Sequence, residues 1–233
     1  MTAADATQLQ IAALQLGVTL TDEQIHALLA YLSLLQKWTK VYNLTAVRDP
    51  AEMLTHHLLD SLAVVAPLRR HIQESATGRV LANKSIRLLD VGSGAGLPGA
   101  VLAIVCPELD VTCVDTVGKK AAFIQQAAVT LQLPNLRGVH ARVEELKAAP
   151  FDIVTSRAFA SLLDFVTLTR FHVKQPIEDS KNRGGVWLAM KGKHPAEEIA
   201  ALPADVAVFH VEPLVVPGLD AERCLIWIRT PPV

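Results

Sequence analysis

The 233 residues of this chain are enough for one large domain, or for one domain with a substantial extension. The 22 basic and 23 acidic residues give a formal net charge of -1 at pH 7, so any RNA contact has to be a local patch. Cys106, Cys113 and Cys224 form no close pair in the sequence, so neither a disulfide framework nor a zinc site is expected, and no other metal is predicted. No apolar run approaches the roughly 20 residues of a membrane span, and no leader-like segment opens the sequence. We therefore expect a soluble, cytoplasmic protein that contacts no membrane.

The first third of the chain shows apolar residues at helical spacing. A short helix is predicted over 6–16, with Gly17 at its end. A capping box at 21–24 starts a longer helix. The core-facing stripe of this helix consists of Ile25, Leu28, Leu29, Leu32, Leu35 and Trp38. The pair Asp49-Pro50 predicts the start of a third helix, which we expect Pro67 to close.

Beyond residue 79 the pattern changes to alternating strands and helices, so we predict a helical N-terminal extension over 1–78 and a ligand-binding domain over 79–233. The predicted strands are 86–91, 111–114, 136–141, 151–155, 186–190, 206–211 and 224–228. The predicted helices between them are 97–105, 119–133, 162–172 and 195–202. This alternation predicts an α/β fold with a mostly parallel, doubly wound sheet, in which ligands bind at the carboxyl ends of the strands. Only a loop separates the last two strands, which predicts a terminal antiparallel pair.

A glycine-rich loop follows the first of these strands. Gly92, Gly94 and Gly96 leave the backbone bare where a ligand has to approach it, and Pro98 suits the first turn of a helix whose free N–H groups face the loop. Taken from Gly94 onward, the glycines match a dinucleotide pattern of nicotinamide or flavin enzymes. Taken from Asp90, they place a carboxylate at the end of the strand, where it can bond an amine or a loop amide and would repel a pyrophosphate. That acid favours S-adenosyl-L-methionine, whose amino-acid part is cationic; a turn that binds nothing is the least favoured interpretation.

Residues just after the other strands should meet in the same crevice, because the carboxyl ends of parallel strands lie together. Asp115 follows the second strand, 19 residues after Gly96, where an acid meets ribose hydroxyls in nucleotide-binding units. After the third strand, Val143 can pack on an adenine ring and Glu144 can accept from its amino group, although Glu144 could equally just begin a short helix. Arg157 follows the fourth strand. A functional role is favoured there, because an ordinary exposed ion pair contributes only ~0–1 kcal/mol and needs no special placement.

Basic residues form two local groups. One lies around the junction of the second and third predicted helices. The other lies in the stretch 174–194, where five Lys or Arg residues stand against two acidic residues. For the first group, solvated surface charge is the plainer interpretation. For the second group, surface charge and RNA binding are equally good interpretations. If these residues bind RNA, their contacts to phosphates would position the RNA without reading its sequence. The RNA-binding candidates are Lys37, Lys40, Arg48, Lys191 and Lys193.

Six blocks of sequence together are similar to one known family. They are 42–49 (YNLTAVRD), 57–61 (HLLDS), 89–99 (LDVGSGAGLPG), 142–145 (RVEE), 156–160 (SRAFA) and 191–192 (KG). This combination resembles the bacterial small-subunit rRNA guanine-N7 methyltransferases, also called the glucose-inhibited division protein B family, over nearly the whole chain from about Thr21. The resemblance implies a class I, Rossmann-like methyltransferase that uses S-adenosyl-L-methionine to modify a guanine in a 16S rRNA hairpin near the decoding centre. By match to the family's motifs, the cofactor contacts would be Gly92, Leu97, Val143, Glu144 and Arg157.

The sequence offers no convincing catalytic base. Guanine N7 has a free lone pair and carries no proton, so its attack on a sulfonium methyl group needs none. Amino-methylating enzymes typically carry an Asn/Asp-Pro-Pro-aromatic motif after the fourth strand. This chain has Ser-Arg-Ala-Phe over 156–159 at that position instead. Catalytic residues are therefore unassigned, and the positioning candidates are Arg157, Lys191, His57 and Asp60. His57, Asp60 and Ser61 could close the cofactor pocket, or they could form an internal clasp between helix and sheet, which is slightly favoured.

The nearly neutral charge conflicts with a bare RNA substrate. We therefore expect a monomeric enzyme that acts on 16S rRNA within the small ribosomal subunit or an assembly intermediate. Three alternatives stay open: a methyltransferase for a small metabolite, an NAD-dependent oxidoreductase, and a non-catalytic nucleoside-binding module. Methyl transfer to subunits, turnover of reduced nicotinamide, and cofactor binding without transfer would separate them.

Overall fold

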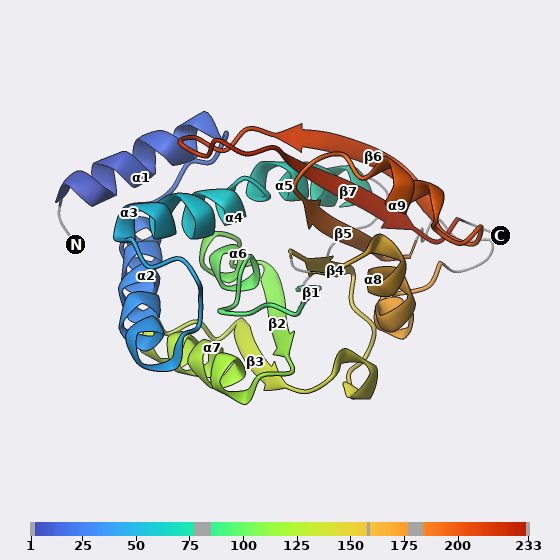
Figure 1. Ribbon diagram of the computed structural model, residues 1–233, viewed down its shortest axis with the longest axis horizontal. Coiled ribbons are helices and arrows are strands. Elements are labelled where there is room, and N and C mark those ends of the chain that lie inside the picture. Colours follow the sequence, from blue (N-terminus) through green and yellow to red (C-terminus); the bar gives the residue numbers. More distant parts are fainter. Residues whose placement is uncertain (1–2, 77–84, 158, 177–183, 232–233) are drawn as a thin grey trace.

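The computed structural model describes residues 3–76, 85–157, 159–176 and 184–231 (Figure 1). The predicted boundary between 1–78 and 79–233 lies outside these residues, as does the part of the basic stretch over 177–183. None of the helices in the described ranges has the length and apolar character needed to cross a membrane.

The first five helices make up the predicted N-terminal extension. They are α1 (Ala3–Gln15), α2 (Asp22–Tyr42), α3 (Pro50–Met53), α4 (Asp60–Leu62) and α5 (Val65–Ala76), with a π-helical turn over Leu54–Leu59 between α3 and α4. The capping box predicted for α2 is present, because Thr21 Oγ1 accepts from the Gln24 amide and Gln24 Oε1 accepts from the Thr21 amide. Asp49 caps α3 by accepting from the amides of Ala51 and Glu52. Local cap chemistry thus fixes where these two helices begin.

In the described part of the chain, seven strands form one sheet in the order β3-β2-β1-β4-β5-β7-β6. They are β1 (Ile86–Val91), β2 (Leu109–Asp115), β3 (Leu136–His140), β4 (Ile153–Ser156), β5 (Val186–Lys191), β6 (Ala207–Leu214) and β7 (Arg223–Arg229). Strands β1 to β5 are parallel, and β7 pairs antiparallel with both β5 and β6. The predicted fold class is therefore confirmed. The strand order reverses at β1, and ligands of open α/β sheets bind at such a switch point.

Helices cover both faces of the sheet (Figure 1). The remaining ones are α6 (Gly99–Val105), α7 (Gly118–Thr130), α8 (Leu162–Thr169) and α9 (Ala196–Ala200). One apolar core runs from the extension through α6 to the sheet and includes Leu28, Val101 and Val111. A second core, around Phe165 and Trp187, lies between the sheet and α8. The extension thus shares its core with one face of the sheet.

Several helix boundaries differ from the expectation by one to three residues, among them both ends of α1 (Ala3–Gln15 instead of 6–16) and the end of α7 (Thr130 instead of 133). Two differences concern the chain near the site. Pro67 does not close the third helix, because the chain turns at Ala63 and Val64 and Pro67 then lies in the first turn of α5. A proline is tolerated there, since the amides of a first turn have no partner within the helix. The helix after the glycine loop begins at Gly99 rather than at Leu97. Leu97 and Pro98 therefore belong to the loop, which is two residues longer than the sequence predicts.

Candidate cofactor and active site

The glycine loop connects the end of β1 to α6 at the switch point of the sheet. Gly92, Gly94 and Gly96 have positive φ angles of 64°, 60° and 85°, which residues other than glycine rarely adopt. A Cβ atom built on Gly92 or Gly94 would meet no other heavy atom within 4 Å. Backbone conformation, not packing, therefore requires glycine at these two positions, and the space beside them is open to a ligand.

Asp115 at the end of β2 holds this loop. One of its carboxylate oxygens accepts from the Gly94 amide at 2.9 Å and the other from the Val117 amide at 2.8 Å, with Lys120 Nζ 3.7 Å away. Because a carboxylate oxygen can accept more than one hydrogen bond, these contacts leave capacity for the hydroxyl groups of a ribose.

Asp90 at the end of β1 lies behind the loop. Its side chain is fully buried, and its Oδ2 accepts from the Gly99 amide at 2.8 Å, at the start of α6. Its Oδ1 has no hydrogen-bond partner among the described residues. Burial raises the pKa of Asp90 from 3.8 to about 7. The sequence allowed an amine or a loop amide as the partner; the partner seen here is the backbone amide of Gly99, directly after the loop.

A cavity of about 400 Å³ lies at the carboxyl ends of β1, β2 and β3, which is within the size range of small-molecule sites. The predicted cofactor contacts that line it are Gly92, Asp115, Val143 and Glu144. Val143 and Phe159 offer apolar surface to a flat ring, whereas Glu144 is exposed and can accept from an amino group. This combination of apolar surface and acceptor oxygens fits a nucleoside. The predicted contacts that do not line the cavity are Asp90, Gly94, Leu97 and Arg157.

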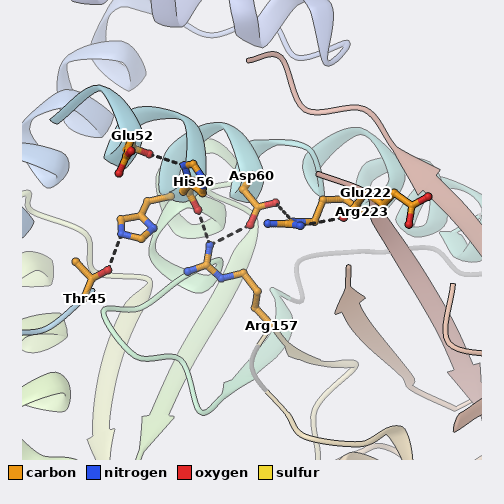
Figure 2. Close-up of polar contacts among 8 residues, drawn as sticks. Thr45, Glu52, His56, Asp60, Arg157, Glu222 and Arg223 are labelled. Atoms are coloured by element: carbon orange, nitrogen blue, oxygen red, sulfur yellow. Dashed lines mark hydrogen bonds and ion pairs between the residues drawn. The ribbon is translucent and has the colours of Figure 1, made fainter. Parts of the chain in front are cut away.

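Arg157 is bound to the helical extension (Figure 2). Its Nη1 donates to the His56 carbonyl at 2.9 Å and to Asp60 Oδ2 at 3.1 Å. Asp60 is only 2% exposed, and its Oδ1 accepts from Arg223 Nε at 2.8 Å. Two guanidinium groups therefore share one buried carboxylate. We call Arg157, Asp60 and Arg223 the Asp60 cluster; with Asp60 ionised it carries a net positive charge.

His57 lies on the π-helical turn beside this cluster. Its Nε2 is 2.9 Å from Thr45 Oγ1, and its Nδ1 has no partner among the described residues. Burial, followed by the charge of Arg157, lowers the pKa of His57 from 6.5 to about 4, so the ring is neutral at pH 7. Over the described ranges no group of three or more His, Cys, Asp or Glu residues is placed to hold a metal ion. The contacts of Asp60 join the helices to the end of β4 and the start of β7, which is the arrangement expected of a clasp.

Four of the RNA-binding candidates are exposed. Lys37 and Lys40 lie on α2, and Lys193 follows β5 beside a second cavity of about 850 Å³. Arg48 is exposed too, but its Nη2 donates to Asn43 Oδ1 at 2.6 Å. The structure thus leaves these cations accessible on α2, on the segment before α3 and in the loop after β5.

Lys191 is different, because its side chain is only 14% exposed. Its Nζ lies 2.8 Å from Glu198 Oε2 in α9 and 3.4 Å from the Phe159 carbonyl in the loop after β4. The charge of Lys191 is therefore already paired inside the fold. Since Phe159 lines the cofactor cavity, Lys191 supports one of its walls.

Two residues that reach the site were missed at the level of the sequence. Arg223 is the first residue of β7, whereas the sequence argument concerns residues that follow strands. An antiparallel strand brings its first residue to the edge where parallel strands end, so the same argument would have found Arg223. Tyr31 is fully buried in α2, and its Oη donates to the Ala95 carbonyl of the glycine loop. No local signal marks a partner 64 residues away.

Solved structures share the fold. A SAM-dependent methyltransferase from Aquifex aeolicus is 15% identical with a TM-score of 0.50, and the match covers 83% of this chain and 97% of that one. TrmN from Thermus thermophilus is 18% identical with a TM-score of 0.52, over 73% of this chain and 48% of that one. At these identities the likeness concerns the fold alone. Together with the strand order and the glycine loop at the switch point, it defines a Rossmann-like methyltransferase fold with a helical N-terminal extension.

Sequence relatives give the family. The family model described as rRNA small subunit methyltransferase G matches residues 24–226. The proteins named Ribosomal RNA small subunit methyltransferase G from Acidovorax ebreus and Paracidovorax citrulli are 65% and 60% identical, over 92% and 97% of this chain and 90% and 91% of theirs. The chain therefore belongs to the rRNA small subunit methyltransferase G family, which confirms the resemblance seen in the sequence. Family and fold together imply S-adenosyl-L-methionine as the cofactor.

Proposed function

We propose that this rRNA methyltransferase modifies N7 of a guanine in a 16S rRNA hairpin near the decoding centre. The observation that carries the proposal is the nucleoside-sized cavity at the carboxyl ends of β1 to β3, in a chain whose relatives are named for methylation of small-subunit rRNA. The choice of base and atom rests on the chemistry around the crevice.

The residues of the chain divide into those that touch the cofactor and those that hold them in place. When bound, S-adenosyl-L-methionine supplies a methyl group on a positively charged sulfur. Val143 and Glu144 take the adenine ring and its amino group, and Asp115 takes the ribose hydroxyls. Gly92 lets the ligand approach the backbone. The other predicted contacts do not line the cavity and act by holding residues that do. Asp90, Gly94 and Leu97 hold the glycine loop, and Arg157 holds the segment after β4.

The ionisable groups near the crevice support a reaction without a general base. The low pKa of His57, about 4, makes it a weak proton acceptor, Asp60 is shared by two guanidinium groups, and Lys191 is paired with Glu198. Guanine N7 suits such a site, because it carries no proton that has to leave. Catalysis then rests on holding the nitrogen, the methyl carbon and the sulfur in line, a gain in entropy that can reach several kcal/mol.

The substrate is proposed to be an assembled or partly assembled small subunit, met in the cytoplasm by a monomer of this chain. The net charge of -1 is unfavourable for free RNA, but four exposed cations are available for local phosphate contacts. These are Lys37, Lys40, Arg48 and Lys193. If free 16S rRNA were bound with a steep salt dependence, which signals many neutralised phosphates, this part of the proposal would be wrong.

The test is methyl transfer from labelled S-adenosyl-L-methionine into small subunits purified from a strain that lacks this protein, followed by mapping of the modified base. We expect label at N7 of a single 16S guanine. Label at another atom or in another RNA would overturn the guanine-N7 assignment. Label only in a metabolite extract would favour a small-molecule methyltransferase, and cofactor binding without any transfer would favour a non-catalytic module.

A matched pair of glycine variants tests the cavity. Gly92→Val strains a residue with a φ of 64° and places a side chain in the open space beside the loop. Gly218→Val strains a residue with a φ of 75° that does not line the cofactor cavity. By calorimetry we expect Gly92→Val to lose cofactor binding and Gly218→Val to retain it. Equal affinities in both variants would refute the assignment of the cavity.

A further inference from the structure

Helix α2 of the extension makes one hydrogen bond to the glycine loop and another to the far end of α6, the helix that follows the loop. Tyr31 Oη donates to the Ala95 carbonyl in the loop before α6. Two turns earlier on α2, Gln24 Nε2 donates to the carbonyl of Val105 at 3.0 Å, at the end of α6. Seven residues of α-helix span roughly 10 Å, which is comparable with the length of α6. The extension therefore holds the loop and α6 as one unit.

The bond from Tyr31 reaches the centre of the loop. Ala95 lies between Ser93, whose carbonyl accepts from the amides of Gly96 and Leu97 at 2.9 Å each, and the first residues of α6. Within the described residues no other donor reaches the Ala95 carbonyl, and Ala95 itself is 6% exposed. Without the hydroxyl group of Tyr31 this carbonyl would be a buried acceptor with no partner, which proteins rarely tolerate.

Tyr31 is well placed to act as a permanent donor. Its side chain is fully buried, and the centroid of its ring lies 5.9 Å from the centroid of the Phe123 ring on α7. Packing therefore fixes the position of the hydroxyl group. Burial raises the pKa of Tyr31 well above its ordinary value. The phenol thus keeps its proton at neutral pH and remains a hydrogen-bond donor.

We propose that Tyr31 is a positioning residue of the cofactor site, and that through it the helical extension holds the glycine loop in the conformation that binds the nucleoside. Tyr31 touches the loop and not the lining of the cavity. Its effect is therefore on the affinity for the cofactor, while the alignment of the reacting atoms is left to other residues. This inference rests on the cofactor cavity of the proposed function.

The test compares Tyr31→Phe with Tyr42→Phe in the full-length chain. Tyr31→Phe removes the hydroxyl group and leaves the ring beside Phe123. Tyr42→Phe is the matched control on the same helix, since Tyr42 is 45% exposed and its ring contacts Trp38. For Tyr31→Phe we expect the Kd and the KM for S-adenosyl-L-methionine to rise on the order of tenfold, with kcat and the KM for small subunits unchanged. Tenfold corresponds to about 1.4 kcal/mol, the size expected when a buried acceptor loses its partner.

A second measurement separates positioning from general stability. In Tyr31→Phe without cofactor, the amides of Gly96 and Leu97 should exchange faster with solvent, whereas amides in the middle of α7 should keep their protection. If Tyr31→Phe bound the cofactor within twofold of the wild type and lowered only the urea midpoint, the inference would be overturned, because Tyr31 would then be an ordinary core residue. A wild-type chain that fails to bind the cofactor would overturn the proposed site as well, and that result appears before any variant is compared.

Discussion

Asp90→Asn tests whether the acid behind the glycine loop is neutral in the folded protein. Asp90 is fully buried; one of its oxygens accepts from the Gly99 amide, and the other has no partner in the part of the chain that the structure describes. Its pKa is raised from 3.8 to about 7, chiefly because burial disfavours the charged form. An asparagine keeps the acceptor for the Gly99 amide and has no charge to bury, so the variant should lose the pH dependence that Asp90 causes.

The size and sign of this dependence follow from the pKa. Because the pKa is higher in the folded chain than in the unfolded chain, the folded chain holds an extra proton between pH 3.8 and about 7. The stability that Asp90 contributes is therefore full below pH 3.8 and is lost as the pH rises through 7. One pKa unit corresponds to about 1.36 kcal/mol, so the whole loss is on the order of 4 kcal/mol. Between pH 5 and pH 8 it amounts to about 3 kcal/mol.

The wild-type curve alone would hide this effect. The pKa of His57 is lowered from 6.5 to about 4, so its contribution has the opposite sign: it is present above pH 6.5 and is lost as the pH falls through 4. The two dependences overlap, and the sum is nearly flat between pH 5 and pH 6.5. The informative quantity is therefore the difference in unfolding free energy between wild type and Asp90→Asn, measured by urea denaturation at pH 5 and at pH 8.

We expect this difference to move by about 3 kcal/mol in favour of the variant between the two pH values. A constant offset from the new amide group cancels in the comparison. Asp110→Asn is the control, because Asp110 lies in a partly exposed ion pair with Arg137 and such pairs contribute only ~0–1 kcal/mol. If Asp90→Asn showed the same small change as the control, Asp90 would be ionised in the folded chain at neutral pH and the reasoning would be refuted.

Three further predictions concern neighbouring parts of the site. Gly99→Ala would place a Cβ atom 2.5 Å from Cys113 Sγ, and calorimetry should show a loss of about 1–3 kcal/mol from overpacking; an unchanged Tm would contradict the packing. Asp60→Asn removes the charge that two arginines share, so we expect a loss of up to about 3 kcal/mol in urea unfolding, together with slower methyl transfer; wild-type values for both would show that the Asp60 cluster is not a clasp. The imidazole NMR signals of His57 should titrate near pH 4, and a midpoint near 6.5 would mean that the ring is hydrated.

The strands and the helix caps could be predicted because their signals are local. A buried parallel strand such as Ile86–Val91 is a short apolar run, and the capping box of α2 depends on two residues three positions apart. The carboxyl-end argument likewise brought Gly92, Asp115, Val143 and Glu144 to one cavity. These predictions need no knowledge of how distant segments pack.

The hydrogen bonds and ion pairs across the site could not be predicted, since the residues that form them are far apart in the sequence. Arg223 and Asp60 are separated by 163 residues, and Arg157 and Asp60 by 97. Lys191 shows that the surroundings of a charge cannot be predicted either. A lysine in a basic stretch looks like a free surface charge, but the fold pairs it with Glu198. The sequence signal for charge is local, whereas the use of that charge depends on what the fold places beside it.

These long-range bonds indicate what the helical extension contributes to the cofactor site. The extension donates to the glycine loop through Tyr31 and accepts from the end of β4 and the start of β7 through Asp60. It also shares an apolar core with α6 and β2. A helical extension that only carried RNA contacts would need none of these bonds. Two of these bonds reach the glycine loop and the segment after β4, which also carry Gly92 and Phe159 of the cavity lining, so the extension is part of the scaffold that holds the cofactor cavity in shape.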